Sequence, residues 1–425
     1  MELTELYQLY LQHPIVATDT RKLPAGCLFF ALKGANFNGN LFALQALEQG
    51  AAYAIIDEPV DSNDSRLIRV NDSLQTLQQL AAYHRHKFQI PFIAITGSNG
   101  KTTTKELVSA VLSAHFTTYT TQGNLNNHIG IPLTLLRVGK DAEMAVIEMG
   151  ANHQQEIAGY CKYVQPTHGI ITNCGKAHLE GFGGIEGVRK GKGELFDFLS
   201  GHDGTAFVYS DYDYLQQMSL SVPHIIWYGS HQGLIQGKEI SSTPFLTIET
   251  TGALELKLTT QLVGSYNLPN VLCAVTVGHF FGVPPEKIQQ AIENYAPTNS
   301  RSQFLNWRGN QVILDAYNAN PSSMKLAIEN FSRQTGERKI LLLGAMKELG
   351  EESLEEHRAL VDLIQSLHFN EVILVGGDFG LIQHPFRYFE HSAAAGKWLH
   401  EQQYKDALLL VKGSRSMQME KVLED

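Results

Sequence analysis

A short glycine-rich run constrains this chain more than any other part of its sequence. Residues 96 to 104 read Thr-Gly-Ser-Asn-Gly-Lys-Thr-Thr-Thr, between the apolar stretch Phe92 to Ile95 and a helix expected from Thr102 to about Ala114. Strand, glycine turn and helix in this order are typical of a phosphate-binding loop. Glycines let backbone N–H groups approach a phosphate, and a helix N-terminus attracts negative charge. An ordinary structural turn is the alternative. The run favours an α/β fold that binds ATP.

Two residues of this loop carry its expected chemistry. Lys101 is placed to reach the outer phosphates, and the Thr102 hydroxyl is placed to hold magnesium. The loop residues expected to contact ATP are Thr96, Gly97, Ser98, Asn99, Gly100, Lys101, Thr102 and Thr103.

Length and strand spacing predict three domains. The 425 residues exceed what one hydrophobic core fills, about 250 to 300 residues. Strands are expected at 27–32, 52–56, 92–95, 144–148, 169–172, 312–314, 339–343, 371–375 and 407–411, with a helix at 41–49. Between 205 and 260, alternating leucines suggest an antiparallel addition to a mostly parallel sheet. The expected domains are 1–88, 89–297 and 298–425.

Composition excludes several classes of protein. A formal net charge of -10 argues against nonspecific nucleic-acid binding, which depends on clustered Lys and Arg. The four cysteines are scattered and form no C-x-x-C pair, so neither a disulfide framework nor a zinc site is expected. No basic segment precedes an apolar stretch at the N-terminus, and no apolar run approaches about 18 residues. We expect a cytoplasmic protein without a membrane span.

Polar residues at strand ends are the first candidates for a metal site. Glu148 ends a predicted apolar strand, and His178 follows another, so both would lie at the sheet edge where α/β proteins bind ligands. Each has an ordinary alternative: a solvated glutamate, and one surface histidine among 17.

The third domain offers two further candidates. Arg301 follows the predicted domain junction, where a cation could reach the γ-phosphate after domain closure; a surface arginine is the alternative. Asp315 ends a predicted strand and precedes Tyr-Asn-Ala-Asn-Pro, which suits ribose and phosphate contacts, although Asn-x-Asn-Pro alone could be a turn or helix cap.

The loop is shorter than the general phosphate-loop pattern. Only Ser98 and Asn99 separate Gly97 from Gly100-Lys101, whereas the general pattern has four residues there. This short form, TGSNGKTT, resembles the loop of the Mur ligase superfamily, which also contains folylpolyglutamate synthases. Four further strings resemble the branch that adds D-alanyl-D-alanine to UDP-N-acetylmuramoyl-tripeptide: NLNNHIGIPLTLL (124–136), EMGANHQQEI (148–157), DAYNANPSSM (315–324) and LVKGSRSM (410–417).

The resemblance covers essentially the whole chain and implies its architecture. It implies a small N-terminal α/β domain for the UDP-substrate, a central P-loop ATPase domain with a mostly parallel sheet, and a C-terminal Rossmann-like domain. It further implies a monomeric, magnesium-dependent ligase of peptidoglycan precursor synthesis that activates a carboxylate as an acyl phosphate.

The resemblance also implies roles for individual residues. Lys192 matches a lysine that relatives carry as a carbamate, which would let it bind a second magnesium ion. The implied catalytic residues are Lys101, Glu148, His178, Lys192 and Arg301, and the implied metal ligands are Thr102, Glu148, His178 and Lys192. Asn267 and Asn270 would bind adenine, and Arg301 and Asp315 would bind other parts of ATP.

Substrate contacts are implied at both ends of the chain. They are Thr20, Arg21 and Asn36 for the UDP group, and Asn126, Asn127, Tyr317, Asn318 and Asn320 elsewhere. Two positions depart from the pattern: many relatives have His where Tyr266 stands, and relatives usually have Asp where Ala345 stands.

Two rival functions remain at this stage. A folylpolyglutamate synthase would share the loop but add glutamate to a folate. A non-catalytic nucleotide switch would need the loop and a magnesium ligand but no third nucleotide-fold domain. The sequence leaves open whether the third residue of the tripeptide is diaminopimelate or lysine.

Overall fold

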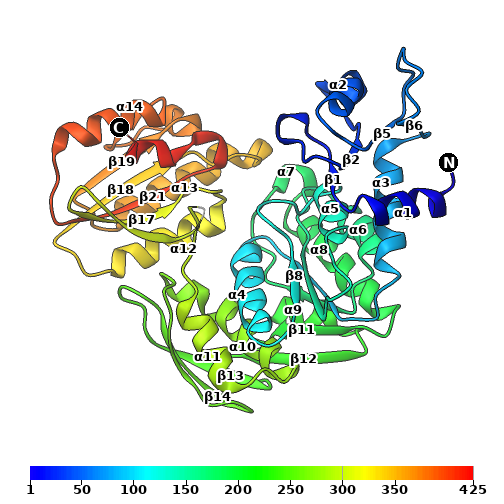
Figure 1. Cartoon of the computed structure of the whole chain (residues 1–425). Coiled ribbons are helices and arrows are strands. Elements are labelled where there is room, and N and C mark those ends of the chain that lie inside the picture. The colour runs from blue at the N-terminus through cyan, green and yellow to red at the C-terminus, as the bar shows by residue number, and fades with distance from the viewer. Residues whose placement is uncertain (299, 425) are drawn as a thin grey trace.

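The computed structural model describes residues 1–298 and 300–424 and has an α/β fold with three large sheets (Figure 1). The strands of each large sheet come from one of the three predicted ranges, which we call the N-terminal unit (1–88), the central unit (89–297) and the third unit (298–425). The boundaries near residues 88 and 297 stay predictions.

The N-terminal unit is built on a parallel sheet with the order β1-β2-β5-β6. Alternating residues of β2 and β5 pack against α2 on one face and against α1 and α3 on the other. The expected strands at 27–32 and 52–56 and the expected helix at 41–49 are therefore present. The elements are α1 Leu3–Gln12, β1 Val16–Ala17, η1 Thr20–Lys22, β2 Leu28–Phe30, β3 Lys33–Gly34, β4 Phe37–Asn38, η2 Gly39–Phe42, α2 Ala43–Glu48, β5 Tyr53–Ile56, β6 Leu67–Arg69 and α3 Ser73–Arg85.

The central unit contains a nine-stranded sheet with the order β15-β14-β13-β12-β11-β10-β7-β9-β8. Strands β8 to β13 pair in parallel, and β14 and β15 add to β13 in antiparallel fashion, as the alternating leucines predicted. The last strand begins at Lys257 rather than at Leu254, because the Thr250 hydroxyl bonds the backbone of Leu254 and Leu256 and holds residues 253–256 in a loop.

The strand order of the central unit explains where a ligand can bind. From β7 the chain continues to β8, on one side of β7 in the sheet, and from β10 it continues to β11, on the opposite side. The direction in which successive strands are added therefore reverses between the neighbouring strands β7 and β10. A crevice opens at the carboxyl ends of strands at such a switch point. The glycine-rich loop follows β7 directly and lies beside the residues that follow β10.

The remaining elements of the central unit surround this sheet. They are β7 Phe92–Thr96, α4 Lys101–Ser113, β8 Thr118–Thr120, α5 Gly130–Leu135, β9 Met144–Glu148, α6 Glu156–Val164, β10 His168–Ile171, α7 Leu179–Phe182, α8 Ile185–Ser200, β11 Thr205–Tyr209, α9 Asp213–Ser219, β12 His224–Gly229, β13 Ile235–Ser241, β14 Thr247–Gly252, β15 Lys257–Thr259, η3 Ser265–Asn267, α10 Leu268–Phe280 and α11 Pro285–Asn294.

The third unit is a six-stranded sheet with the order β16-β17-β21-β18-β19-β20, parallel except for the edge strand β16. Leu341 and Leu343 face α12 and α13, and Ile340 and Leu342 face α14 and η7, so helices cover both faces as in Rossmann-like folds. The elements are β16 Gln303–Trp307, β17 Asn310–Asp315, α12 Pro321–Arg333, β18 Arg338–Gly344, η4 Gly350–Glu352, α13 Ser353–Ser366, β19 Glu371–Val375, η5 Gly377–Leu381, β20 Arg387–Phe389, α14 Ser392–Gln402, β21 Ala407–Lys412, η6 Arg415–Met417 and η7 Met419–Leu423.

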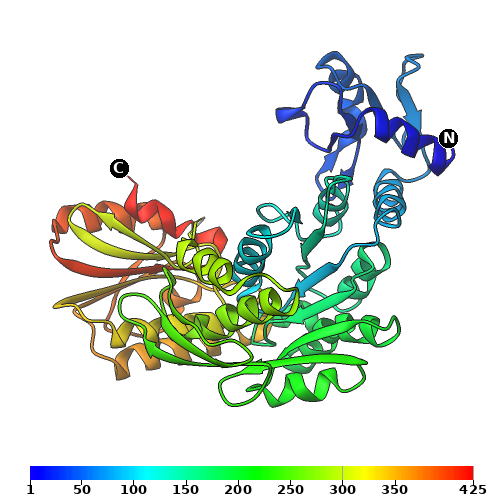
Figure 2. The same ribbon diagram turned by 60° about the horizontal axis from the view of Figure 1, so that its bottom comes forward.

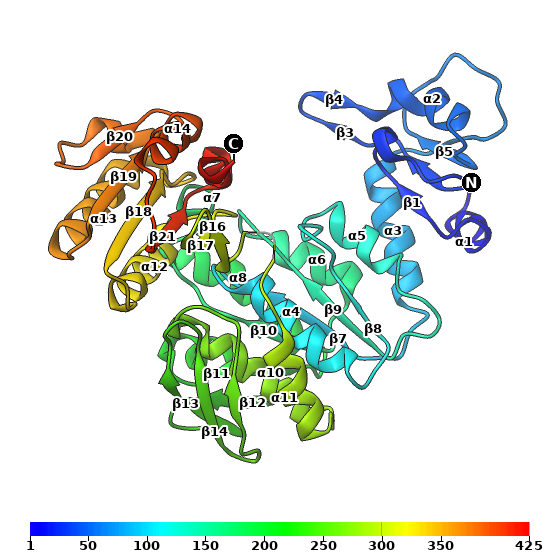
Figure 3. The same cartoon turned by 60° about the vertical axis from the view of Figure 1, so that its left-hand side comes forward.

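The central unit lies between the other two units, and the N-terminal unit stands apart from the third (Figures 2 and 3). Helix α3 connects the first two units and packs against α5 and α6. None of the helices in the described ranges combines the length and the apolar character needed to cross a lipid bilayer.

The buried Arg85 at the end of α3 ties the connecting helix to the central unit. Its guanidinium donates to the carbonyls of Val164 at 2.8 Å, Phe88 at 2.9 Å and Gln165 at 2.8 Å, and it lies 3.7 Å from the Phe92 ring centroid. Burial lowers the pKa of Arg85 to about 10.

We therefore expect Arg85→Met to lower the free energy of unfolding by about 3 kcal/mol, because it leaves buried carbonyls without donors. Arg69→Met at an exposed position is the matched control and should change it by less than about 0.5 kcal/mol. Urea unfolding monitored by circular dichroism measures both. Equal stability of the two variants would contradict this role of Arg85.

Candidate active site

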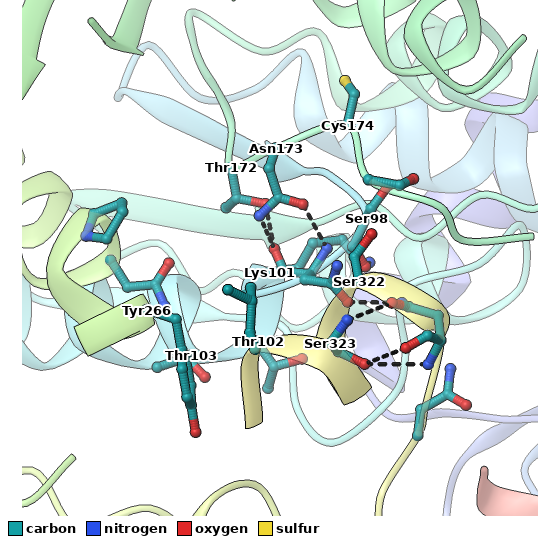
Figure 4. Close-up of a pocket in the computed structure, with 18 of the residues that line it drawn as sticks. Ser98, Lys101, Thr102, Thr103, Thr172, Asn173, Cys174, Tyr266, Ser322 and Ser323 are labelled. Carbon is teal, nitrogen blue, oxygen red and sulfur yellow. Dashed lines mark hydrogen bonds between the residues drawn. The ribbon is translucent and has the colours of Figure 1, made fainter. Parts of the chain in front are cut away.

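A cleft of about 940 Å³ opens where the central and third units meet. Its walls come from the glycine-rich loop, the segments after β9 and β10, the start of α10, and the start and one face of α12. Figure 4 shows Lys101 and Thr102 of the loop with Thr172 and Asn173 near them, and with Ser322 and Ser323 of α12 also facing the cleft. The loop therefore lies at the centre of an interdomain cleft.

Two glycines of the loop are required by close contacts. A Cβ atom added to Gly97, whose φ is +142°, would lie 2.0 Å from the Thr172 hydroxyl, and one added to Gly100, whose φ is +78°, would lie 2.8 Å from the Asn270 Oδ1. The Thr172 hydroxyl and the Asn173 Nδ2 donate to the Asn99 carbonyl at 2.6 and 3.1 Å, and the Asn99 N–H donates to Asn173 Oδ1 at 3.0 Å. These bonds hold the loop in shape.

Lys101 begins α4 and folds back over this loop. Its Nζ donates to the carbonyls of Gly97 at 2.6 Å and Ser98 at 3.1 Å. Burial is the main cause that lowers the pKa of Lys101 to about 8; the Glu148 carboxylate opposes this change and the Arg301 charge adds to it. The ammonium is thus placed where a phosphate group cradled by the loop would meet it.

Glu148, at the end of β9, is almost fully buried and only half satisfied. Its Oε1 accepts hydrogen bonds from the Thr102 hydroxyl at 3.2 Å and from Asn126 Nδ2 at 2.7 Å. Its Oε2 is buried and has no hydrogen-bond partner. A buried carboxylate oxygen without a partner is costly, and a bound cation would satisfy it. This orphaned oxygen fits a magnesium ion.

His178, the residue before α7, lines the same cleft. Its Nδ1 lies 2.5 Å from Oε2 of Glu348, a residue of the third unit. This is an ion-pair contact by distance, but its angle lies outside that of a formed hydrogen bond, so Nδ1 has no hydrogen-bond partner. His178 and Glu148 both line the cleft that contains the loop.

Lys192 is buried on α8, behind the cleft wall rather than among its lining residues. Its Nζ donates to the Ala151 carbonyl at 3.0 Å and lies 4.8 Å from the Phe182 ring centroid. Burial, together with the Lys101 charge, lowers the pKa of Lys192 to about 7. No ion pair is formed by this lysine within the described ranges. Such an amine is partly neutral at pH 7 and can act as a nucleophile.

The third unit contributes the opposite wall of the cleft. The Arg301 guanidinium carbon lies 3.5 Å from the Tyr317 ring centroid. Asp315 accepts a hydrogen bond from the buried Lys412 at 2.6 Å. Asn320 Nδ2 donates to Asn99 Oδ1 at 2.7 Å, which joins the third unit directly to the phosphate loop.

The predicted adenine site lies at the start of α10. Asn270 Nδ2 donates to Asn267 Oδ1 at 2.9 Å, and Asn270 Oδ1 accepts the Thr104 hydroxyl at 3.0 Å. Tyr266, where relatives often have His, lines the cleft, and its hydroxyl lies 3.2 Å from the Ser302 hydroxyl. Position 266 thus keeps an aromatic ring at the cleft.

Ala345, where relatives usually have Asp, is fully buried and does not line the cleft. A Cβ atom added to Gly377 would lie 2.5 Å from the Ala345 Cβ. The alanine thus packs closely against a glycine of the neighbouring segment.

The structure brings most of the predicted residues together. Of the predicted site, the residues that line the cleft are Ser98, Asn99, Gly100, Lys101, Thr102, Thr103, Asn126, Asn127, Glu148, His178, Asn267, Asn270, Arg301, Asp315, Tyr317, Asn318 and Asn320. Thr96 is buried beneath the loop, where its hydroxyl donates to the Met149 carbonyl at 2.8 Å.

Three predicted UDP contacts lie outside this cleft, in the N-terminal unit. Thr20 and Arg21 belong to η1, and Asn36 lies in the exposed turn between β3 and β4. The exposed Arg21 is paired with Asp19 at 2.6 Å. The predicted UDP-binding residues therefore lie in a different unit from the phosphate loop and do not line the same cleft.

Several lining residues escaped the sequence prediction. A group of tyrosines on the cleft wall contains Tyr209, Tyr212 and Tyr214, and the rings of Tyr212 and Tyr214 stack with an interplanar angle of 12°. Lys412 ends β21, the strand paired with β17, so it lies opposite Asp315 in the register. Lys412 directly follows the strand expected at 407–411, so the strand-end rule that found Asp315 could have found Lys412 as well, although not its pairing with Asp315.

Within residues 1–298 and 300–424, no three His, Cys, Asp or Glu side chains gather into a group that could hold a metal ion. Among the predicted metal ligands that line the cleft, Glu148 offers a carboxylate oxygen without a partner, Thr102 a hydroxyl and His178 an imidazole. Such a sparse donor set suits magnesium that arrives with phosphates, because Mg²⁺ keeps several waters and uses few protein ligands.

Three family models match the chain and together span most of it. They describe the Mur ligase family, catalytic domain (residues 14–85), the Mur ligase middle domain (95–278) and the Mur ligase, glutamate ligase domain (300–415).

Named relatives match over nearly the full length. The UDP-N-acetylmuramoyl-tripeptide--D-alanyl-D-alanine ligase of Escherichia coli is 36% identical over 96% of this chain and 92% of its own. MurF of Acinetobacter baumannii has a TM-score of 0.87 at 33% identity, covering 96% of this chain and 92% of that chain. MurF ligase of Thermotoga maritima, solved in complex with ADP, has a TM-score of 0.86 at 27% identity, covering 96% of each chain.

A folylpolyglutamate synthase of Thermotoga maritima is more distant. It has a TM-score of 0.62 at 13% identity and covers 82% of this chain and 92% of that chain, a likeness of fold alone. The near-full-length relatives decide the classification: the chain belongs to the Mur ligase family.

Proposed function

We propose that this chain is an ATP-dependent amide ligase that joins D-alanyl-D-alanine to UDP-N-acetylmuramoyl-tripeptide, a step of peptidoglycan precursor synthesis. The observation that carries the proposal is the interdomain cleft, in which the phosphate loop meets the Tyr-Asn-Ala-Asn-Pro segment at the Asn99–Asn320 bond. The relatives that match over nearly the full length carry this activity in their names.

The first step would transfer a phosphoryl group. A carboxylate resists attack by an amine because it is anionic and lacks a good leaving group. An oxygen of the tripeptide carboxylate attacks the γ-phosphorus of ATP, the bond to the β-phosphate oxygen breaks, and ADP leaves. Lys101 and Arg301 would neutralise charge on the transferred group, and the loop amides would hold the phosphates in line.

The second step would form the amide. The neutral amine of D-alanyl-D-alanine attacks the acyl phosphate carbonyl, the carbon–oxygen bond to phosphate breaks, and inorganic phosphate leaves while the nitrogen loses a proton. Asn318 and Asn320 lie on the cleft wall next to the phosphate loop and would orient the substrates. Positioning and electrostatics would supply most of the catalysis.

Magnesium would enter this site with ATP. Thr102 and the free oxygen of Glu148 fit one ion, and His178 is an additional candidate ligand. We propose two magnesium ions in all, which would neutralise charge on the phosphates.

Lys192 would contribute through a modification. Carbon dioxide adds to a neutral amine to give a carbamate and a proton, and the lowered pKa of Lys192, which forms no ion pair among the described residues, favours that reaction at neutral pH. The resulting anion could hold the second magnesium ion.

The remaining proposals concern substrates and cellular context. Thr20, Arg21 and Asn36 would bind the UDP group, and Asn126 and Asn127 would contact the peptide. Asn267 and Asn270 would bind the adenine of ATP, and Asp315 would bind its ribose. We further propose a cytoplasmic monomer that binds no nucleic acid.

Phosphate release with ATP and magnesium tests this function. We expect release with UDP-tripeptide plus D-alanyl-D-alanine, and none when either is omitted or when folate plus glutamate replaces them. Release with the folate pair would assign the chain to the folylpolyglutamate branch, and release from ATP alone would favour a nucleotide switch. Comparing tripeptides that end in diaminopimelate and in lysine identifies the third residue.

A further inference from the structure

The contact between His178 and Glu348 joins two units that are far apart in sequence. His178 lies in the central unit and lines the cleft, and Glu348 lies in the loop between β18 and η4 of the third unit. Their Nδ1 and Oε2 atoms are 2.5 Å apart. This contact exists only while the third unit is docked on the central unit.

Both residues have an uncommon backbone conformation. The φ angles of His178 and Glu348 are 52° and 63°, in the left-handed region that side chains other than glycine rarely adopt. Such conformations persist where the surrounding structure enforces them, and they cluster at functional sites. The backbone therefore aims these two side chains at each other at a conformational cost.

Neighbouring contacts hold the two segments together. The Lys176 ammonium pairs with Glu356 of α13, and the Lys176 N–H donates to the Ser322 hydroxyl at 3.0 Å. Gly350 is packed against Glu180, since an added Cβ would lie 3.3 Å from the Glu180 Cβ. The His178–Glu348 pair is thus one contact in a docked face, and its central-unit partner, His178, lines the cleft.

Imidazole chemistry gives this pair a specific consequence. A carboxylate in close contact with Nδ1, as Glu348 is here, favours the tautomer in which Nδ1 carries the proton and Nε2 carries the lone pair. Among the described residues, no hydrogen bond engages Nε2 of His178, so this nitrogen stays available to the cleft. Partners of this kind hold the ring of a ligand in place.

We propose that Glu348 is a positioning residue, which sets the Nε2 lone pair of His178 toward the divalent cation only when the third unit closes. The proposal rests on the metal role of His178 given under the proposed function. Because coupling free energies are reciprocal, the cation then favours the closed arrangement by the same factor by which closure strengthens cation binding.

Manganese titrations of the full-length protein with ATP, followed by electron paramagnetic resonance, test this coupling. Glu348→Gln removes the charge and keeps the size of the side chain. We expect it to weaken Mn²⁺ binding by about 10- to 100-fold. Glu356→Gln removes the neighbouring interdomain ion pair and is the matched control, with an expected change of less than about 3-fold.

A double-mutant cycle separates positioning from general docking. In a His178→Ala background, Glu348→Gln should have no further effect on Mn²⁺ affinity, because its target is gone. Wild-type affinity in Glu348→Gln, or an equal loss with and without His178, would overturn the proposal.

The ligase selectivity of the unmodified chain is a separate result. If the unmodified chain selects UDP-tripeptide and D-alanyl-D-alanine while the cycle shows no coupling, the positioning role alone fails. If that selectivity is absent, the proposed function fails, whatever the manganese titrations show.

Discussion

Replacing Lys101 by alanine is expected to lower kcat by about 10³-fold or more, because the variant loses a preorganised cation that faces the transferred phosphate. Lys101 Nζ already lies over the loop that would hold the phosphates, 2.6 Å from the Gly97 carbonyl. Coupled phosphate-release kinetics with saturating UDP-tripeptide, dipeptide and ATP measure the effect.

Lys140→Ala, at an exposed lysine in the loop after α5, is the control and should keep the kcat of the unmodified protein. The fold of Lys101→Ala should survive, since the residue bonds only loop carbonyls. A cooperative thermal transition near that of the unmodified protein would show this. Retained turnover in a folded Lys101→Ala protein would remove the assigned role of the loop.

Replacing Lys192 by methionine is expected to lower kcat by about 10²-fold, a loss typical for a group that supports a metal site. Methionine fills similar space but cannot form a carbamate. Lys190→Met on the same helix is the matched control, because Lys190 is exposed, and it should leave kcat unchanged.

The ligase activity of the unmodified protein should depend on carbon dioxide, and that of Lys192→Met should not. The pKa of Lys192 is lowered to about 7, so the neutral amine is abundant above pH 7 and declines as pH falls. Removal of carbon dioxide should therefore reduce the activity of the unmodified protein. The bicarbonate concentration needed to restore that activity should increase as the pH is lowered from 8 to 6. Activity that ignores bicarbonate, together with no ¹³C signal from a labelled carbamate, would rule out the modification.

Buried parallel strands were the most predictable part of this fold. The strands expected at 144–148 and 371–375 match β9 and β19 residue for residue, because each contains four consecutive apolar residues and is paired with a strand on both sides. Edge strands were harder to see. The sequence of β16 is mixed and only partly buried, and β20 has three residues, so neither has a distinctive period.

The site was predictable wherever chemistry follows a strand along the chain. Glu148 and Asp315 end strands, and the phosphate loop links a strand to a helix. Residues whose role depends on strand order or domain docking could not be found in this way. Lys412 reaches Asp315 because β21 pairs with β17, and Glu348 reaches His178 because two units dock. No local pattern encodes such pairings.

The route of a single oxygen atom tests the central claim most directly. If the chain activates the tripeptide as an acyl phosphate, UDP-tripeptide labelled with ¹⁸O in its terminal carboxylate should transfer one ¹⁸O atom to each inorganic phosphate released as the amide forms. ³¹P NMR resolves the labelled phosphate by its isotope shift. Unlabelled phosphate accompanying amide product, or AMP in place of ADP, would contradict the account.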